Sequence, residues 1–216
     1  MIADIGTQGG EFVSYIESNN FEGAYQLGQL LVQEMEGNSQ YRGSVGIIAI
    51  PQNRKNGQLR TEGFLKALAE AGIKASDIRQ QVDFSYEETY QFAQQLIDEN
   101  SDMTALWLQG ADRYQAVLDA INDSGKSGEI LLVCFDAEPE FIEMIRDHSL
   151  VASGMQQPFL MGSKAVDTLQ AYWQGLAVPK TQQLGVLTVS SQNLEMLLPT
   201  IQRNVLGIPL SSEQSF

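Results

Sequence analysis

The stretch from Ser44 to Leu68 constrains the fold more than any other part of the chain. It begins with the β-branched apolar run SVGIIAI, continues through the polar loop PQNRKNGQ and ends in LRTEGFLKAL. In the last segment Phe64, Leu65 and Leu68 fall on one face of a helix. The stretch therefore predicts a strand, a loop and a helix, in that order.

The same unit recurs along the chain. Strand-like runs at 104–108, 130–135 and 150–155 are each followed by polar residues and then by a helical pattern. This repetition predicts an α/β fold with a parallel, doubly wound sheet of the Rossmann type. Because such sheets bind ligands beyond the carboxyl ends of their strands, we looked for functional residues directly after each strand-like run.

Further patterns complete the expected order of elements. Strands are predicted at 1–5, 12–16, 77–83 and 185–189, and helices at 21–36, 86–97, 114–121, 139–147 and 158–175. In the helix 158–175 we expect Ala165, Leu169 and either Tyr172 or Trp173 to face inward. The residues from 199 onward show no periodicity, so no element is predicted there.

Composition limits the kind of protein and its partners. With 216 residues, of which 43% are hydrophobic, the chain can form one large domain or two small lobes. Its formal net charge of -14 argues against nucleic acid or an anionic membrane as a direct partner, since both would repel it. The amino-terminal MIADIGTQGG lacks a signal-peptide pattern, so the protein is cytoplasmic or its true start lies upstream.

Residues typical of catalysis or metal binding do not form a recognisable motif. Cys134 lies in the apolar run LLVCF and His148 at the polar end of a helix, which favours a buried thiol and a surface imidazole. The segment DSGKSG follows a helix and lacks the first glycine of a phosphate loop. The acidic cluster at 136–140 lacks the glycine of a calcium loop. We therefore expect no enzyme activity, no cofactor and no metal site.

Polar and aromatic residues follow the predicted strands and form the candidate binding set. The set comprises Asp4, Arg60, Phe84, Gln109, Asp112, Asp136 and Gln156. Carboxylates and carboxamides hydrogen-bond to hydroxyl groups, arginine presents a planar fork, and an aromatic ring covers the apolar face of a sugar. The set predicts a neutral polyhydroxylated ligand, with the Arg60 charge offset by Asp4 or Asp136.

Each candidate also has an ordinary structural interpretation. Arg60 suits an exposed helical surface, Phe84 a core, and Asp136 and Gln156 a turn or helix cap. Asp4 suits the solvated end of a strand. The functional interpretation depends on all of these residues reaching the same edge of the sheet.

A resemblance to a known family supports that interpretation. The ordered segments FVSYIESNNFEGAYQLG, GSVGIIAI, LRTEGFLKAL, CFDAEP, ASGMQQPFLMG and LGVLTVSSQNL are similar to the type 1 periplasmic sugar-binding proteins, especially the ribose-binding group, and to the sensor domains of LacI-type repressors. The resemblance covers nearly the whole chain. It implies two Rossmann-like lobes that clamp a sugar and are joined by three crossings, near Ser18, Gln157 and Gly185. It also implies that Asp4, Arg60, Phe84, Asp136 and Gln156 contact the ligand.

The chain departs from the family pattern in several places. Ile5 stands where the family often has Arg, and Gly110 where it often has Asn, so Gln109 or Asp112 would have to substitute. These changes and an added aromatic at Trp107 suggest a ligand other than a simple pentose.

The resemblance also predicts how the chain is divided. Because family members have more strand-helix units before the point matching Met1, we expect a complete second lobe and a remnant of the first. Residues 19–156 and 186–216 would form the second lobe, and residues 1–18 and 157–185 the remnant. We expect these 216 residues alone to bind ligand weakly or not at all.

The expected function is that of a solute-binding protein in a sugar ABC-type uptake system, closing about a hinge. It would be periplasmic and would act with a membrane transporter or receptor component. The alternative is the effector domain of a LacI-type repressor, in the cytoplasm, or of a membrane-bound signalling receptor. An exposed sheet edge favours a homodimer.

Overall fold

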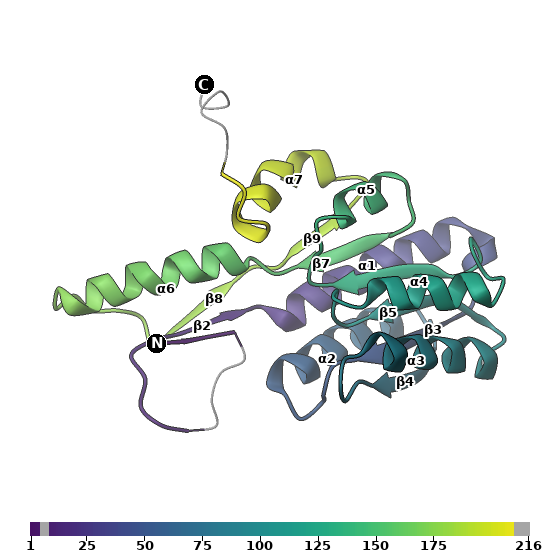
Figure 1. Ribbon diagram of the computed structural model, residues 1–216, viewed down its shortest axis with the longest axis horizontal. Coiled ribbons are helices and arrows are strands. Elements are labelled where there is room, and N and C mark those ends of the chain that lie inside the picture. Colours follow the sequence, from purple (N-terminus) through teal and green to yellow (C-terminus); the bar gives the residue numbers. More distant parts are fainter. Residues whose placement is uncertain (5–8, 210–216) are drawn as a thin grey trace.

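The computed structural model of the protein describes residues 1–4 and 9–209 and contains two sheets (Figure 1). The strands are β1 (Ile2–Ala3), β2 (Tyr15–Ser18), β3 (Ser44–Ala49), β4 (Ala75–Gln80), β5 (Met103–Leu108), β6 (Leu131–Phe135), β7 (Ala152–Met155), β8 (Thr181–Leu184) and β9 (Leu187–Ser190). The helices are α1 (Asn20–Gly37), α2 (Lys55–Glu70), α3 (Tyr86–Glu99), α4 (Tyr114–Asp123), α5 (Phe141–Arg146), α6 (Pro158–Trp173) and α7 (Leu194–Thr200). A 3₁₀ turn spans Ser39–Tyr41, and a π-helical segment, Ile201–Val205, follows α7.

The large sheet has the strand order β4-β3-β5-β6-β7-β9. Its neighbouring strands are parallel from β4 to β7, which confirms the expected α/β fold with a doubly wound sheet. The last pair, β7 and β9, is antiparallel, which the expectation of a parallel sheet did not include. Strand β7 leads from the large sheet into α6 of the arm, whereas β9 leaves the arm directly after β8, with only Gly185 and Val186 between them, so β7 and β9 run in opposite directions (Figure 1).

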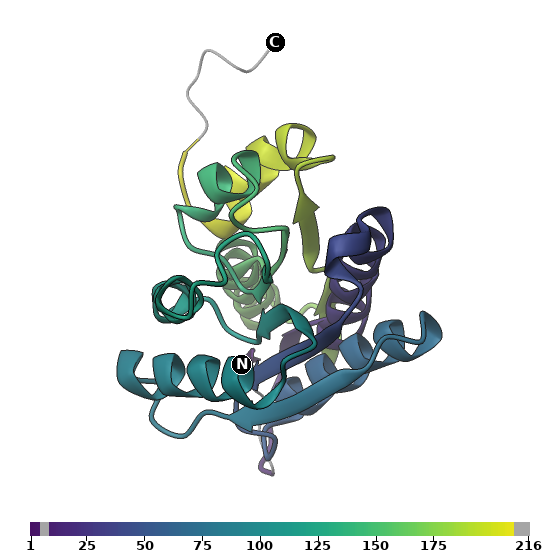
Figure 2. The ribbon, with the colours of Figure 1, turned by 90° about the vertical axis from the view of Figure 1, so that its right-hand side faces the viewer.

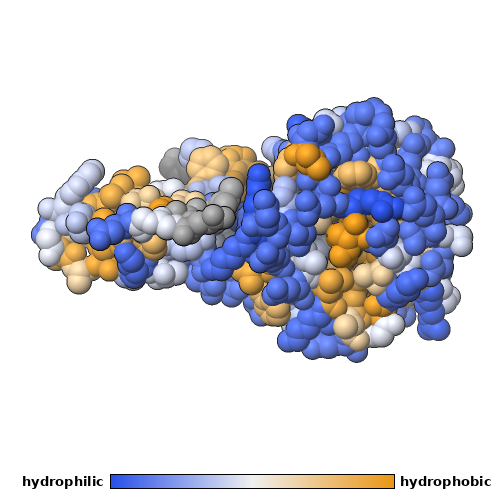
Figure 3. Space-filling model, turned by 90° about the horizontal axis from the view of Figure 1, so that it is seen from below, coloured by the Kyte–Doolittle hydropathy of each residue, from blue (hydrophilic) through white to orange (hydrophobic). Residues whose placement is uncertain are grey.

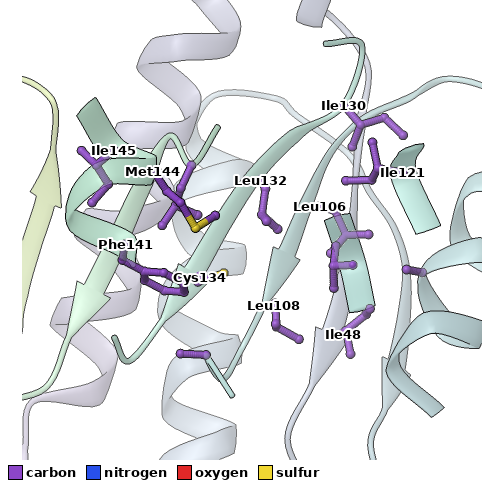
Figure 4. Close-up of a cluster of buried hydrophobic side chains, with 14 of the residues drawn as sticks. Ile48, Leu106, Leu108, Ile121, Ile130, Leu132, Cys134, Phe141, Met144 and Ile145 are labelled. Carbon is purple, nitrogen blue, oxygen red and sulfur yellow. The ribbon is translucent and has the colours of Figure 1, made fainter. Parts of the chain in front are cut away.

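Helices cover both faces of the large sheet because its strands are apolar on both sides (Figure 2). Ile47 and Trp107 lie in the cluster that packs against α1 and α2. Ile48 and Leu106 point to the opposite face and pack with α3, α4 and α5 (Figure 4). Neighbouring residues thus enter different cores, as strand geometry requires.

Trp107 belongs to the core. Its ring is fully buried and stacks on Phe64, with the ring centroids 3.9 Å apart. The prediction that it alters the ligand was therefore wrong, because the side chain points from β5 toward α1 and α2.

The small sheet, in the order β1-β2-β8, forms with α6 a narrow arm beside the large sheet (Figure 1). Only Ile16, Met161 and Leu184 are buried apolar residues in the cluster beneath α6. Tyr172 and Trp173 are 50% and 79% exposed, so the prediction that one of them faces inward was wrong. Seen from below, hydrophobic residues are spread over the surface of this arm (Figure 3).

The chain passes between the two sheets at three points, after Ser18, at Gln157 and at Gly185. Hydrogen bonds tie these points together. The amide of Asn19 donates to the carbonyl oxygen of Leu184 at 2.8 Å, and Nε2 of Gln157 donates to that of Gly185 at 2.8 Å. On the basis of these passages we propose the division into lobes given above. Residues 1–18 and 157–185 form the remnant of the first lobe, and residues 19–156 and 186–216 form the second lobe.

Several predicted boundaries are shifted. The strand expected at 12–16 is β2, Tyr15–Ser18, and the strand expected at 77–83 is β4, Ala75–Gln80. Strand β8 and the helical residues 194–205 were not predicted, since neither segment shows a clear period. The part of the predicted first strand at Ile5 lies outside the described residues. Homodimer formation through a sheet edge stays a prediction.

None of the described helices is both long enough and apolar enough to cross a bilayer.

Two helical glycines give a matched test of the packing between α1 and α2. A Cβ atom added at Gly63 would overlap the backbone carbonyl oxygen of Phe21, whereas one added at Gly162 on α6 would meet nothing within 4 Å. We expect Gly63→Ala to lower the free energy of unfolding by about 1–3 kcal/mol through overpacking. Gly162→Ala should raise it by up to about 1 kcal/mol through helix propensity. Urea unfolding measures both, and equal effects would contradict the described packing.

Candidate ligand-binding site

Arg60 is the centre of the candidate site. It lies in the second turn of α2, is only 2% exposed, and donates to groups from three other parts of the chain. Its Nε donates to Oδ1 of Asn20 at 2.8 Å, and its Nη1 donates to the carbonyl oxygen of Gln109 at 2.8 Å. Nη1 also lies 3.2 Å from Oδ2 of Asp136. A buried guanidinium needs such partners, because an unpaired buried charge is strongly destabilising.

The ring of Phe135 completes the surroundings of Arg60. The guanidinium carbon lies 4.0 Å from the ring centroid, a cation-π distance. Of the two carboxylates expected to offset the Arg60 charge, Asp136 is the one that contacts it.

Asp136 and Gln156 form a pair at the carboxyl ends of β6 and β7. Nε2 of Gln156 donates to Oδ1 of Asp136, while Oδ2 of Asp136 faces Arg60. Oε1 of Gln156 is buried and has no donor among the described residues. The Asp136 side chain is 35% exposed, so this pair borders open space.

Asp4 reaches the same region from the small sheet. Its amide donates to the carbonyl oxygen of Ile16 at 2.9 Å, and its own carbonyl oxygen accepts from the Tyr15 hydroxyl at 2.8 Å. Its Oδ1 is buried without a donor among the described residues. Burial raises the pKa of the Asp4 carboxyl, and the Arg60 guanidinium opposes that rise.

Asp4, Asp136 and Gln156 line one cavity of about 280 Å³. Its lining residues come from the carboxyl ends of β6 and β7, from the arm and from the π-helical segment. The remaining lining residues are Ala137, Pro158, Met161 and Val205. The structure thus brings Asp4, Arg60, Asp136 and Gln156 into one neighbourhood.

Backbone conformation marks three of the candidates. Asp4, Phe84 and Asp136 have φ angles of 67°, 58° and 68°, in the left-handed region that residues with side chains rarely adopt. Outside the glycines the same region contains only one other described residue, His148. Such strain is concentrated at functional sites, where the surrounding structure must hold it.

Phe84 is held by a capping interaction before α3. The Glu88 carboxylate accepts from three consecutive amides, those of Val82 at 2.7 Å, Asp83 at 3.2 Å and Phe84 at 2.9 Å. Ser85 caps the helix as expected by accepting from the Glu88 amide at 3.1 Å, but the reciprocal bond of a capping box is not made, because the Ser85 amide donates to Asp83. The Phe84 ring lies 5.6 Å from the guanidinium of Arg54 and does not line the cavity.

Gln109 forms side-chain hydrogen bonds to other parts of the chain. Its side chain is completely buried, and Oε1 accepts from the amide of Ile50 at 2.9 Å. Its Nε2 donates to Oγ1 of Thr61 at 2.8 Å and to the carbonyl oxygen of Gly57 at 3.2 Å. These bonds attach Ile50, just after β3, and the first two turns of α2 to the end of β5, so we do not carry Gln109 into the proposed contact set.

Asp112 is on the surface, with its side chain 56% exposed and one carboxylate oxygen 3.6 Å from Nη1 of Arg113. It does not line the cavity, and we do not include it in the proposed contact set either.

Comparisons with known proteins identify the family to which this chain belongs. Residues 2–177 match the family described as a periplasmic binding protein domain. The chain belongs to that family. The ribose import binding protein RbsB of Haemophilus influenzae is 26% identical over 174 residues, which are 80% of this chain and 56% of that protein. The HTH-type transcriptional repressor PurR of Salmonella arizonae is 32% identical over 128 residues, covering 58% of this chain and 35% of the repressor.

Solved structures of the family share the fold. A carbohydrate transporter solute-binding protein from Agrobacterium radiobacter, in complex with D-arabinose, aligns with a TM-score of 0.79 at 21% identity. The alignment covers 94% of this chain and 69% of that one. A myo-inositol-binding protein from Caulobacter aligns with a TM-score of 0.78 at 20% identity. The alignment covers 90% of this chain and 66% of that one. The chain spans about half the length of the ribose import binding proteins it matches, 56% and 54%.

Within this family fold, sequence reasoning missed several residues of the site. Asn20 and Tyr15 position Arg60 and Asp4, and Met161 and Val205 line the cavity. Asn20 directly follows a crossing between the sheets, a position that pointed toward the site. Met161 and Val205 carry no such signal, because apolar residues in helices are usually core.

Residues typical of enzymes lie elsewhere. Cys134 is fully buried, and burial raises the pKa of its thiol, which lowers its reactivity. His148 is exposed after α5. In residues 1–4 and 9–209 no group of three or more His, Cys, Asp or Glu side chains is placed to hold a metal ion.

Replacing Glu88 should loosen the turn that carries Phe84. Because Glu88→Ala removes the acceptor of three amides, we expect it to lower the free energy of unfolding by about 1–2 kcal/mol. Glu88→Gln, which keeps one acceptor oxygen, should cost less, and Glu87→Ala is the control at an exposed neighbour. Urea unfolding with Phe84 amide exchange measures the effect. A Glu88→Ala protein as stable as Glu87→Ala would refute this role.

Asp4 should make stability depend on pH. Because its pKa is raised on folding, its ionisation penalises the folded state, and stability is lost as pH rises through the folded pKa. We expect the stability of Asp4→Asn relative to the parent protein to increase from pH 4 to pH 7.5, measured by urea unfolding. Asp98→Asn, on the exposed surface of α3, controls for losing a carboxylate. A difference that stays constant or shrinks over this range would contradict the burial of Asp4.

Proposed function

We propose that this chain is the ligand-binding part of a solute-binding protein that delivers a sugar or sugar-like molecule to an ABC-type uptake system. The observation that carries the proposal is the convergence of Asp4, from the small sheet, with Asp136 and Gln156, from the large one, around one cavity. The buried Arg60 contacts Asp136 from α2. Ligand hydroxyl groups would donate to the free oxygens of Asp4 and Gln156. Arg60 would act by holding Asp136 in place.

The binding event we propose is closure about the three passages between the sheets. A ligand can shift an equilibrium between open and closed forms only if it makes contacts in one form that it lacks in the other. Asp4 and Met161 lie on the arm side of the cavity, while Asp136 lies on the side of the large sheet. A ligand that touches both sides would therefore favour the closed form.

The location and partners follow from this proposal. We propose a periplasmic protein that acts with a membrane transporter component and does not bind nucleic acid or catalyse a reaction. The family membership and the sugar-bound solved structures of the same fold support the proposal. So does the complete burial of the only cysteine, the one thiol that could serve as a nucleophile.

A second candidate is the ligand-sensing domain of a LacI-type repressor. Sequence identity to the repressor PurR is 32%, compared with 26% to the ribose import binding protein. The PurR match covers less of the chain. The reading frame upstream of Met1 distinguishes the two candidates. A helix-turn-helix sequence would favour the repressor, and a signal peptide would favour transport.

Titration with a panel of pentoses, hexoses and inositol tests the proposed function. Because the described residues bring Asp4, Asp136 and Gln156 together around one cavity, we narrow the expectation of weak or no binding to weak, saturable binding by these 216 residues, detected by NMR at millimolar ligand. Arg60→Ala should weaken it at least about 30-fold, the equivalent of about 2 kcal/mol for a lost buried partner. Arg42→Ala, at the opposite edge of the sheet before β3, should leave it unchanged.

Gln156→Met keeps the size of the side chain and removes its hydrogen bonds, so it tests the site if Arg60→Ala does not fold. Binding by no sugar, or binding indifferent to both variants, would refute the proposed function. Micromolar binding would support the function and contradict the expected weakness.

A further inference from the structure

The start of α6 and the π-helical segment meet through two buried carboxamides. Gln157, directly before α6, is 7% exposed, and Asn204 in the π-helical segment is 8% exposed. Nδ2 of Asn204 donates to Oε1 of Gln157 at 2.7 Å, and Nε2 of Gln157 donates to the carbonyl oxygen of Gly185 at 2.8 Å. We call Gln157 and Asn204 the amide pair.

The direction of each hydrogen bond of the amide pair is fixed. A backbone carbonyl only accepts, so Gln157 must turn Nε2 toward Gly185 and Oε1 toward Asn204. A guanidinium only donates, so Nε of Arg203, 3.0 Å from Oδ1 of Asn204, leaves Nδ2 of Asn204 to face Gln157. Neither carboxamide can therefore turn over without placing two donors or two acceptors together.

The amide pair connects the arm to the large sheet. Gln157 directly precedes the helix of the arm, and Gly185 lies where the chain leaves β8 of the arm for β9. Asn204 lies between Ile201 and Val205, which are buried in the cluster on one face of the large sheet. The pair thus joins two of the three passages between the sheets to a helical segment that is packed on the large sheet.

An ion pair also links the arm to the large sheet, but it is exposed. Nζ of Lys55, on α2, lies 3.3 Å from Oε2 of Glu17, on β2. The Lys55 side chain is 62% exposed, and exposed ion pairs contribute little to stability. Breaking the hydrogen bonds of the amide pair would instead leave buried polar groups without partners. The amide pair is therefore the stronger restraint on the arm.

Each member of the amide pair is next in sequence to a residue of the cavity lining. Gln156, directly before Gln157, and Val205, directly after Asn204, both line the cavity. Gln156 is in turn hydrogen-bonded to Asp136. A displacement of the amide pair would therefore move residues that line the cavity, although Asn204 itself does not line it.

We infer that Asn204 is a positioning residue of the ligand site, which acts through Gln157 to hold the arm in the orientation in which Asp4 and Asp136 line one cavity. This inference rests on the proposed function, because it concerns the same site. A ligand that needs Asp4 and Asp136 together binds only the fraction of molecules in which the arm has this orientation. An arm that is less restrained therefore lowers the apparent affinity.

Distances between the arm and the large sheet test the restraint in the absence of ligand. Spin labels are attached to the full 216-residue chain through Val166→Cys on α6 and Gln95→Cys on α3, both at exposed positions. The native Cys134 is fully buried. Double electron-electron resonance then measures the distribution of distances between the labels. Because Asn204→Asp keeps the size of the side chain and removes the donor to Gln157, we expect it to broaden this distribution.

A second variant of the amide pair tests whether the two residues act together. Gln157→Met removes both hydrogen bonds of the Gln157 side chain and should also broaden the distribution. In the double variant, Asn204→Asp should add little to the effect of Gln157→Met, because the two residues act through one contact. If Asn204→Asp does not fold, Gln157→Met tests the same contact.

Two control variants separate the restraint from added charge and from lost stability. Asn122→Asp makes the same chemical change on the exposed surface of α4. Gly63→Ala places its overlap between α1 and α2, away from the amide pair, and is expected to destabilise the chain. Both controls should leave the distance distribution unchanged.

Sugar titration of the same variants relates the restraint to the site, with D-arabinose and myo-inositol as probes. For a probe that binds the unsubstituted chain, we expect Asn204→Asp to raise the dissociation constant at least about threefold. A distance distribution that Asn204→Asp leaves unchanged, or an unchanged dissociation constant in a variant whose distances have broadened, would overturn the inference and leave sugar binding intact. If neither probe nor any other sugar binds the unsubstituted chain, the proposed function fails and the role in ligand binding fails with it. The distances, measured without sugar, distinguish that failure from a failure of the restraint.

Discussion

The organisation of the site depends on one buried positive charge. Arg60 is nearly inaccessible to solvent, and removing a guanidinium from water is costly unless each of its neighbours compensates. The compensating groups come from the start of α1, the end of β5 and the end of β6, and the Phe135 ring lies against the charge. These three segments and α2, which carries Arg60, therefore cannot shift relative to one another without exposing the guanidinium. Arg60 thereby orients Asp136, and Asp136 in turn orients Gln156.

The parallel arrangement of strands explains why separate segments can meet at this charge. Strands β3, β5, β6 and β7 run in one direction, so their carboxyl ends lie along one edge. Left-handed backbone then turns the chain directly after β1 at Asp4, directly after β6 at Asp136, and just before α3 at Phe84. Side-chain direction at these positions is set by the backbone, which leaves fewer conformations to be lost when a ligand binds.

The sequence allowed part of this to be predicted. Apolar runs followed by polar residues identified the strand ends, and Asp136 and Gln156 meet because β6 and β7 end at the same edge of the large sheet. Asp4 reaches them from the small sheet and Arg60 from α2. Gln109 also follows a strand, but nothing in the sequence shows that its side-chain amide is hydrogen-bonded to the Ile50 amide and the Thr61 hydroxyl. In a strand that is apolar on both faces, the direction of Trp107 is equally hidden. Strand β8, with the polar sequence TQQL, lacks any alternation that could have revealed it.

The narrow arm has a consequence for how the molecule fluctuates. Its apolar core consists of few side chains beneath a single helix, whereas the large sheet is sandwiched between two extensive clusters. Segments that bury little apolar surface open at lower free energy than the rest of a protein. Backbone amides of β2 and β8 should consequently exchange with deuterium through local opening, while those of β5 and β6 exchange only when the whole chain unfolds. Asp4, which belongs to the arm, would then lie in a segment that opens more readily than the segments that carry Asp136 and Gln156.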